Sequence, residues 1–169
     1  MRPYQKIVMT SAPAAVILIR LLVGGVFLSE GIQKFLFPAE VGAGRFAKIV
    51  IPNAEVMAPF VGVVEIVCGA LILLGFFTRM AAIPLIINML VAIVSTKIPI
   101  LLGHGFWGFN LRNLPYYGFW GMAHEARTDF AMLLCSLFLL IVGAGAWSLD
   151  ARMTTRSIGH RMKGKDRWR

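Results

Sequence analysis

Four long apolar stretches alternate with short polar connections along the chain. They cover residues 12–37, 56–77, 80–102 and 130–149. A membrane-crossing helix needs about 20 mostly apolar residues, and each stretch meets that length. The turn at Thr78-Arg79 is so short that the second and third stretches must be antiparallel neighbours. The pattern predicts an all-α integral membrane protein, a four-helix bundle in which every helix spans the bilayer.

Composition supports a membrane location and argues against a soluble domain. Hydrophobic residues make up 58% of the 169 residues and charged residues 15%, whereas a soluble domain carries about 25% charged residues. The net charge of +9 does not indicate nucleic-acid binding, because seven of the 17 basic residues follow the last apolar stretch. We expect a four-span domain over residues 1–151 and a basic tail over 152–169 beside anionic lipid.

The distribution of basic residues predicts the orientation in the membrane. With both termini on one side, and with Arg20 and Lys34 left out, that side holds ten basic residues and the other side holds five. Basic residues concentrate on the cytoplasmic side of membrane proteins. We therefore expect a multi-pass protein of the cell (inner) membrane with both termini in the cytoplasm. The five residues expected outside are Arg45, Lys48, Lys97, Arg112 and Arg127.

Two of the apolar stretches carry small and charged residues on one helical face. The spacing i, i+4, i+7, i+11 keeps four residues on the same side of a helix. Small residues on such a face allow helix backbones to approach closely within lipid. The charged residues that share these faces should therefore point into the bundle. The two stripes are Arg20, Gly24, Phe27 and Gly31, and Ala58, Gly62, Glu65 and Gly69.

Charges inside the apolar stretches need partners, because an ionised side chain at the centre of a bilayer is expensive. Counted from the ends of their stretches, Arg20 and Glu65 lie at similar depth. We expect a buried Arg20–Glu65 pair. Such a pair can fix the register between helices without any chemistry, so a structural role and a functional role both stay open.

A second polar layer is expected near the outer face. Glu30 and Lys34 stand at i and i+4, the order that favours an ion pair along a helix. Asp129 opens the last apolar stretch at the same level, with Arg127 close by. The predicted outer polar cluster consists of Glu30, Lys34, Asp129 and Arg127.

The connection before the last stretch is rich in aromatic residues. Between residues 106 and 120 it contains seven aromatics, and Gly-Phe-Trp-Gly occurs twice. One interpretation is a belt at the membrane surface, where Trp and Tyr accumulate. The other is a lid over the outer cluster that stacks a flat ligand such as a quinone ring. The lid would consist of Trp107, Tyr116, Tyr117 and Trp120.

The chain resembles the DoxX family of small four-helix membrane proteins over residues 14–151. The resemblance is carried by Arg20-Leu-Leu-Val-Gly24, by Glu30 with Gly31 and Lys34, by the segment from Glu65 to Arg79, and by the segment from Gly143 to Asp150. The chain departs from the family in having Ala144 where proline is usual, and Asp129 where glutamate is common. The resemblance implies a role beside membrane redox chemistry, with quinone as the implied cofactor.

Three functions agree with these features. The first is a small membrane subunit of a respiratory or other redox complex that interacts with quinone. The second is an assembly or scaffold subunit of a larger membrane complex, and the third is a small transporter. The first two imply other membrane protein subunits as partners. Because the sequence contains no nucleophile–base pair, phosphate loop or metal-binding motif, we expect no independent catalyst and no metal site. Cys68 and Cys135 are expected to be apolar packing residues.

Overall fold

The computed structural model describes residues 12–154, and all regular elements in this range are helical. An isolated bridge between Phe106 and Phe109 lies in a connecting loop. The predicted basic tail lies outside the described residues except for its first three positions, 152–154. The helices are α2 (Val16–Leu36), α3 (Ala43–Lys48), α4 (Ala54–Leu74), α5 (Thr78–Ala92), the π-helical segment η1 (Ile93–Lys97), α6 (Ile98–Leu102) and α7 (Phe119–Val142).

Three segments have the length and composition of membrane spans. They are α2, α4, and the continuous run from α5 through η1 to α6, with lengths of 21, 21 and 25 residues. The all-helical class and three spans are therefore confirmed. The run over residues 78–102 contains one π-helical segment, a local widening that often occurs at functional sites.

The fourth predicted span, residues 130–149, differs from the helix that forms there. Helix α7 begins at Phe119 and ends at Val142, because Gly143 adopts φ 86° and the chain leaves the helix. Its first half is polar and contains Glu125, Arg127 and Asp129, so only its second half is apolar. The length and composition of α7 do not identify it as a span, and a fourth crossing stays a prediction.

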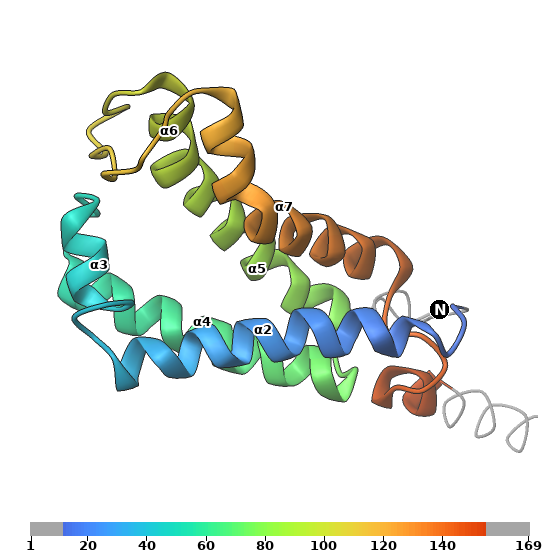
Figure 1. Cartoon of the computed structure of the whole chain (residues 1–169). Helices are drawn as coiled ribbons and strands as arrows, with labels where there is room; N and C mark the ends of the chain where they lie inside the picture. The colour runs from blue at the N-terminus through green and yellow to red at the C-terminus, as the bar shows by residue number, and fades with distance from the viewer. Residues whose placement is uncertain (1–11, 155–169) are drawn as a thin grey trace, which may run out of the picture.

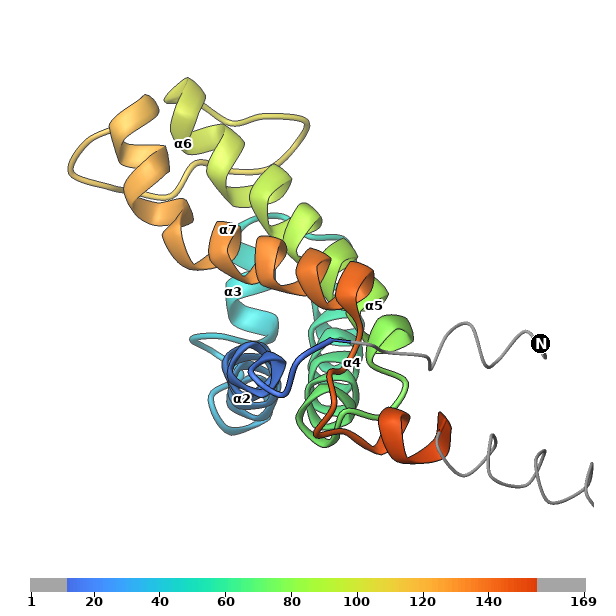
Figure 2. The ribbon, with the colours of Figure 1, turned by 90° about the vertical axis from the view of Figure 1, so that its right-hand side faces the viewer.

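The helices form two antiparallel pairs, α2 with α4 and α5 with α7 (Figures 1 and 2). The pairs meet where α2 begins and α7 ends, which we call the terminal end. They diverge toward the opposite end, where α3 and the loop over residues 103–118 lie, which we call the loop end (Figure 1). A hydrogen bond from the Asn110 side chain to the Lys48 carbonyl at 3.5 Å joins that loop to α3.

The glycine stripes bring α2 and α4 into backbone contact, as expected. A methyl group at Gly31 would lie 2.7 Å from the carbonyl oxygen of Gly62, and one at Gly69 would lie 2.9 Å from the carbonyl oxygen of Gly24. Both distances are too short for a carbon atom against a backbone oxygen. The two glycine pairs therefore fix the register of α2 against α4.

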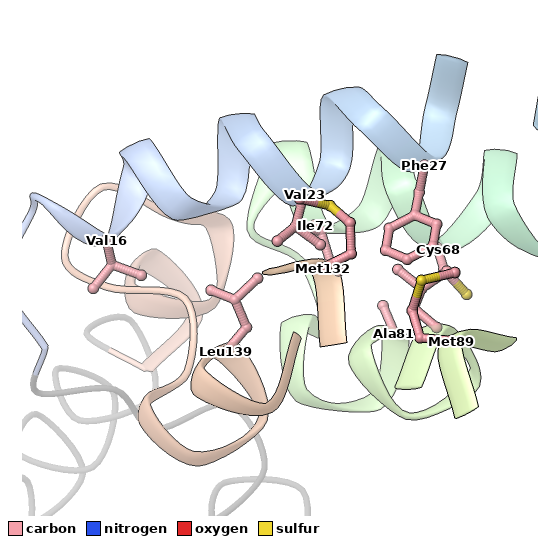
Figure 3. Packing of buried hydrophobic residues seen from close by; sticks show 10 residues of the cluster. Val16, Val23, Phe27, Cys68, Ile72, Ala81, Met89, Met132 and Leu139 are labelled. Atoms are coloured by element: carbon pink, nitrogen blue, oxygen red, sulfur yellow. The ribbon is translucent and has the colours of Figure 1, made fainter. Parts of the chain in front are cut away.

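The apolar core fills the part of the bundle nearer the terminal end (Figure 3). All four long helices contribute to it, and its buried residues are Val16, Val23, Phe27, Cys68, Ile72, Ala81, Leu85, Met89, Met132 and Leu139.

Toward the loop end the same helical faces become polar. On α2 the face that carries Phe27 continues to Glu30 and Lys34, at steps of three and four residues. On α4 it continues from Cys68 to Glu65, and on α7 from Met132 to Asp129. The interior of the bundle is thus apolar in one half and charged in the other.

Candidate functional site

The candidate site is a buried polar cluster that joins α2, α4 and α5. The Lys34 ammonium donates a hydrogen bond to Oε2 of Glu65 at 2.6 Å, and the Asn88 amide donates to Oε1 at 2.6 Å. The side chains of Lys34 and Glu65 are 9% and 3% exposed. Both oxygens of the buried carboxylate therefore have a donor. We call Lys34, Glu65 and Asn88 the central cluster.

Lys34 and Glu65 meet because their side chains lean toward each other. Gly31 lies opposite Gly62. Lys34 is three residues from this glycine pair toward the loop end, and Glu65 is three residues from it toward the terminal end. Their Cα atoms are therefore offset by about 9 Å along the helix axes. Every Cα–Cβ bond tilts toward the N-terminus of its own helix, and in antiparallel helices the two tilts converge. The long lysine side chain covers the remaining distance.

The expected pair between Arg20 and Glu65 does not form in the structure. Both residues are buried, at 2% and 3% exposure, but they have different partners. Because α2 begins at Val16 rather than at residue 12, Arg20 lies only about 6 Å from the terminal end. Glu65 is nine residues from the end of α4 at Leu74, or about 14 Å. The side chain of Arg20 also leans toward the terminal end, away from Glu65.

Arg20 instead joins the end of α4 to the segment after α7 at the terminal end of the bundle. Its guanidinium donates to the carbonyl oxygens of Ile72 at 2.9 Å and Leu73 at 2.5 Å, in the last turn of α4. It also donates to the carbonyl oxygens of Ala144 at 3.3 Å and Trp147 at 2.6 Å, in the segment after α7. Carbonyl groups in the last turn of a helix have no partner within the helix, and a nearby arginine can satisfy them.

Asp150 complements Arg20 at the same end. Its carboxylate accepts hydrogen bonds from the backbone N–H groups of Phe77 at 2.8 Å and Thr78 at 3.1 Å, where α5 begins. It also attracts the Arg20 guanidinium electrostatically. Gly75, with φ +66°, leaves room for this arrangement, because a methyl group there would lie 2.6 Å from the guanidinium. The motif that ends at Asp150 therefore serves packing at the terminal end.

The four residues of the predicted outer polar cluster do not form one cluster in the structure. Lys34 pairs with Glu65 rather than with Glu30. Asp129 pairs with Lys97 of η1 at 2.9 Å, and the Lys97 side chain is only 6% exposed. Arg127 contacts the ring of His124 at 3.3 Å on the exposed side of α7. The Glu30 carboxylate forms no hydrogen bond and no ion pair within residues 12–154. The expected four-residue cluster is therefore incorrect.

Sequence reasoning missed Lys97 and Asn88 as members of the polar interior. Lys97 stands in an otherwise apolar stretch, so its need for an acidic partner was a usable signal. Asn88 is uncharged and gave no comparable signal, because its role depends on the position of Glu65 on another helix.

The aromatic residues do not cover the central cluster. Trp107 is 84% exposed and Trp120 is 78% exposed. The hydroxyl of Tyr117 donates to the carbonyl of Arg112 at 3.3 Å, within its own loop. Tyr116 is half exposed and packs its ring against His124. The predicted lid is therefore not formed, whereas exposed aromatics at the loop end agree with a belt at the membrane surface.

No metal centre is found in the part of the chain that the structure describes. Residues 12–154 contain no group of three or more His, Cys, Asp or Glu side chains suited to hold an ion. Cys68 and Cys135 are both free thiols, and Cys68 belongs to the apolar core.

The fold and the cluster define a small helical membrane protein with a charged site buried between its spans. A model of the DoxX family matches residues 15–98. The chain is 54% identical to the uncharacterized membrane protein Rv3486 of Mycobacterium tuberculosis, over 91% of this chain and 90% of that protein. It is 33% identical to an uncharacterized protein of Haemophilus influenzae, over 78% of this chain and 85% of that protein. The chain belongs to the DoxX family. No solved structure matches it.

Proposed function

We propose that this protein is a membrane subunit of a redox complex and that its central cluster binds the head group of a quinone. The observation that carries the proposal is the Lys34–Glu65–Asn88 cluster, which places hydrogen-bonding groups from three helices between the membrane spans. Intramembrane ionisable residues commonly mark functional sites. The partners would be other membrane protein subunits, which would carry the redox centres.

The chemistry of the cluster suits a quinone head group. The Lys34 ammonium has three N–H donors and uses one on Glu65, and the Asn88 amide also uses one of two. The remaining donors can bind the carbonyl oxygens of a quinone, and the carboxylate of Glu65 can accept a hydrogen bond from a quinol. Phe27, Cys68 and Met89 lie together in the core beside these helices (Figure 3). A few polar groups beside apolar walls are typical of a small-molecule site.

Binding of a short-chain ubiquinone analogue to the purified full chain tests the proposal. Asn88→Leu removes one neutral donor and leaves the Lys34–Glu65 pair in place, so we expect binding up to about tenfold weaker. Asn110→Leu changes the same residue type on the exposed loop over residues 103–118 and should bind like the wild type. Affinity is measured by quenching of protein fluorescence in detergent.

The competing function is a scaffold subunit without a ligand. It would be favoured if the wild-type chain fails to bind the quinone analogue and the Asn88→Leu variant still assembles with its partner subunits. The same binding signal in the wild type and in both variants would show that the quinone partitions into the detergent and does not bind at the cluster.

We also propose that the protein lies in the inner membrane with both termini in the cytoplasm and that α7 is a fourth crossing. This orientation rests on the excess of basic residues in the sequence before α2, between α4 and α5, and after α7. Reporter fusions after Arg79 and Arg169 should therefore report the cytoplasm, and fusions at Arg45 and Arg112 the opposite side. A C-terminal reporter on the outside would contradict the orientation and the fourth crossing together.

A further inference from the structure

A short helix follows α7 and is held against the turn between α4 and α5 at the terminal end (Figures 1 and 2). Within the described residues it covers 149–154, and the Ser148 hydroxyl accepts a hydrogen bond from the Ala151 N–H at 3.1 Å, as at a capped helix start. The Asp150 N–H donates to the carbonyl oxygen of Gly75 at 2.9 Å. This contact and the Asp150 carboxylate, which binds the start of α5, fix the position of the short helix.

One face of the short helix lines a cavity. Leu149, Arg152 and Met153 stand at i, i+3 and i+4, so their side chains leave the helix on the same side. Together with Phe76 of the α4–α5 turn they line a cavity of about 280 Å³, which we call the terminal cavity. Three of its four lining residues are apolar, and the fourth is an arginine.

The terminal cavity lies at the level where two membrane spans meet water. Helix α4 ends at Leu74 and α5 begins at Thr78, and Phe76 lies in the turn between them. Trp147, just before the short helix, is 69% exposed, and tryptophan favours the membrane–water boundary. The head groups of phospholipids occupy this level of a bilayer.

The guanidinium of Arg152 is available for a ligand. It forms no hydrogen bond and no ion pair with any residue in the range 12–154, and Arg152 is exposed. Six more basic residues and one acidic residue follow it in the sequence. Such a cluster of basic residues beside a span attracts anionic lipid. A positive charge beside apolar walls therefore complements a ligand with an anionic group and an apolar part.

We propose that the terminal cavity binds one anionic phospholipid. The guanidinium of Arg152 donates hydrogen bonds to the lipid phosphate, which arginine binds well because two of its N–H groups can donate in parallel. Phe76 and Met153 pack against the glycerol and the first carbons of an acyl chain. The proposal does not rest on quinone binding, because the central cluster lies between α2, α4 and α5, about 14 Å from the end of α4. Failure of the quinone experiment would leave it intact.

Native mass spectrometry of the full chain in detergent tests the proposal. Phosphatidylglycerol, which is anionic, and phosphatidylcholine, which is not, are titrated separately with the same acyl chains, and the fraction of protein with one bound lipid is measured. The wild type should bind phosphatidylglycerol more tightly. Arg152→Gln should weaken this binding about tenfold, because it removes charge-assisted hydrogen bonds, and Arg152→Lys should retain most of it. Arg169→Gln, an equal change of charge at the end of the tail, should bind like the wild type.

A second variant tests the apolar wall. Met153→Ser leaves every charge in place and should also weaken the binding of phosphatidylglycerol, because an acyl chain loses an apolar contact. Equal losses in Arg152→Gln and Arg169→Gln would overturn the proposal, since the charge of the tail and not the cavity would then attract the lipid. Equal binding of the two lipids by the wild type would also overturn it. So would displacement of phosphatidylglycerol by an equal concentration of inorganic phosphate, which would show a site for a free anion.

Discussion

Replacing Arg20 by methionine should lower the free energy of unfolding by about 3–5 kcal/mol, the range measured when one partner of a buried charge network is removed. The guanidinium satisfies carbonyl groups from two segments, the end of α4 and the stretch after α7. Methionine preserves the apolar part of the side chain, so the loss of stability measures the contribution of the polar contacts. Asp150 would also lose its neighbouring positive charge. Unfolding in detergent, followed by circular dichroism against denaturant, measures the change.

Arg112→Met is the matched control for this prediction. Arg112 contacts Glu125 at 3.5 Å, and its side chain is 46% exposed. An exposed ion pair of this kind contributes at most about 1 kcal/mol. If Arg20→Met and Arg112→Met unfold at the same denaturant concentration, the Arg20 contacts between α4 and the segment after α7 do not stabilise the fold as we expect.

The Lys34–Glu65 pair should show strong coupling in a double-mutant cycle. Lys34→Met and Glu65→Leu should each destabilise the protein by about 3–5 kcal/mol, because each leaves a buried charge without its partner. The double variant should be clearly more stable than the sum of the two losses predicts, since it contains no unpaired charge at this position. The free energies of unfolding of all four proteins, measured in the same detergent, give the coupling energy.

The exposed pair Arg112 and Glu125 provides the control cycle. Its two single changes should add within about 0.5 kcal/mol. Additive losses for Lys34→Met and Glu65→Leu would instead show that the ion pair at 2.6 Å contributes no coupling, and the central cluster would lose its physical basis.

The position of a charged residue along its helix can be predicted from the sequence only as accurately as the two ends of that helix. Helix α4 is bounded by Asn53 and Gly75, close to the limits of the second apolar stretch, and Glu65 lies near the middle of this helix. Arg20 was placed too deep, because residues 12–15 are apolar but precede the helix. An error of one helical turn was enough to suggest a partner that the structure does not provide.

The last helix shows the same limit. The apolar run over residues 130–149 suggested a span, but Gly143 ends α7 and the residues after it turn back over Arg20. Hydropathy does not distinguish an apolar residue in a helix from one in a buried turn. The polar first half of α7 was expected to be a loop, and it forms helix because it packs beside α6 and presents Asp129 to Lys97.

The sequence by itself determined that the protein is helical, that it is a membrane protein, that glycine stripes bring two helices together, and that Arg20 and Glu65 are buried. These properties follow from local composition and helical periodicity. The tertiary structure decided which charged residues meet, namely Lys34 with Glu65 and Lys97 with Asp129. Partner choice depends on the register between antiparallel helices and on the direction in which each side chain leaves its helix. A difference of a few ångströms in either one selects another partner, and no single segment of sequence contains that information.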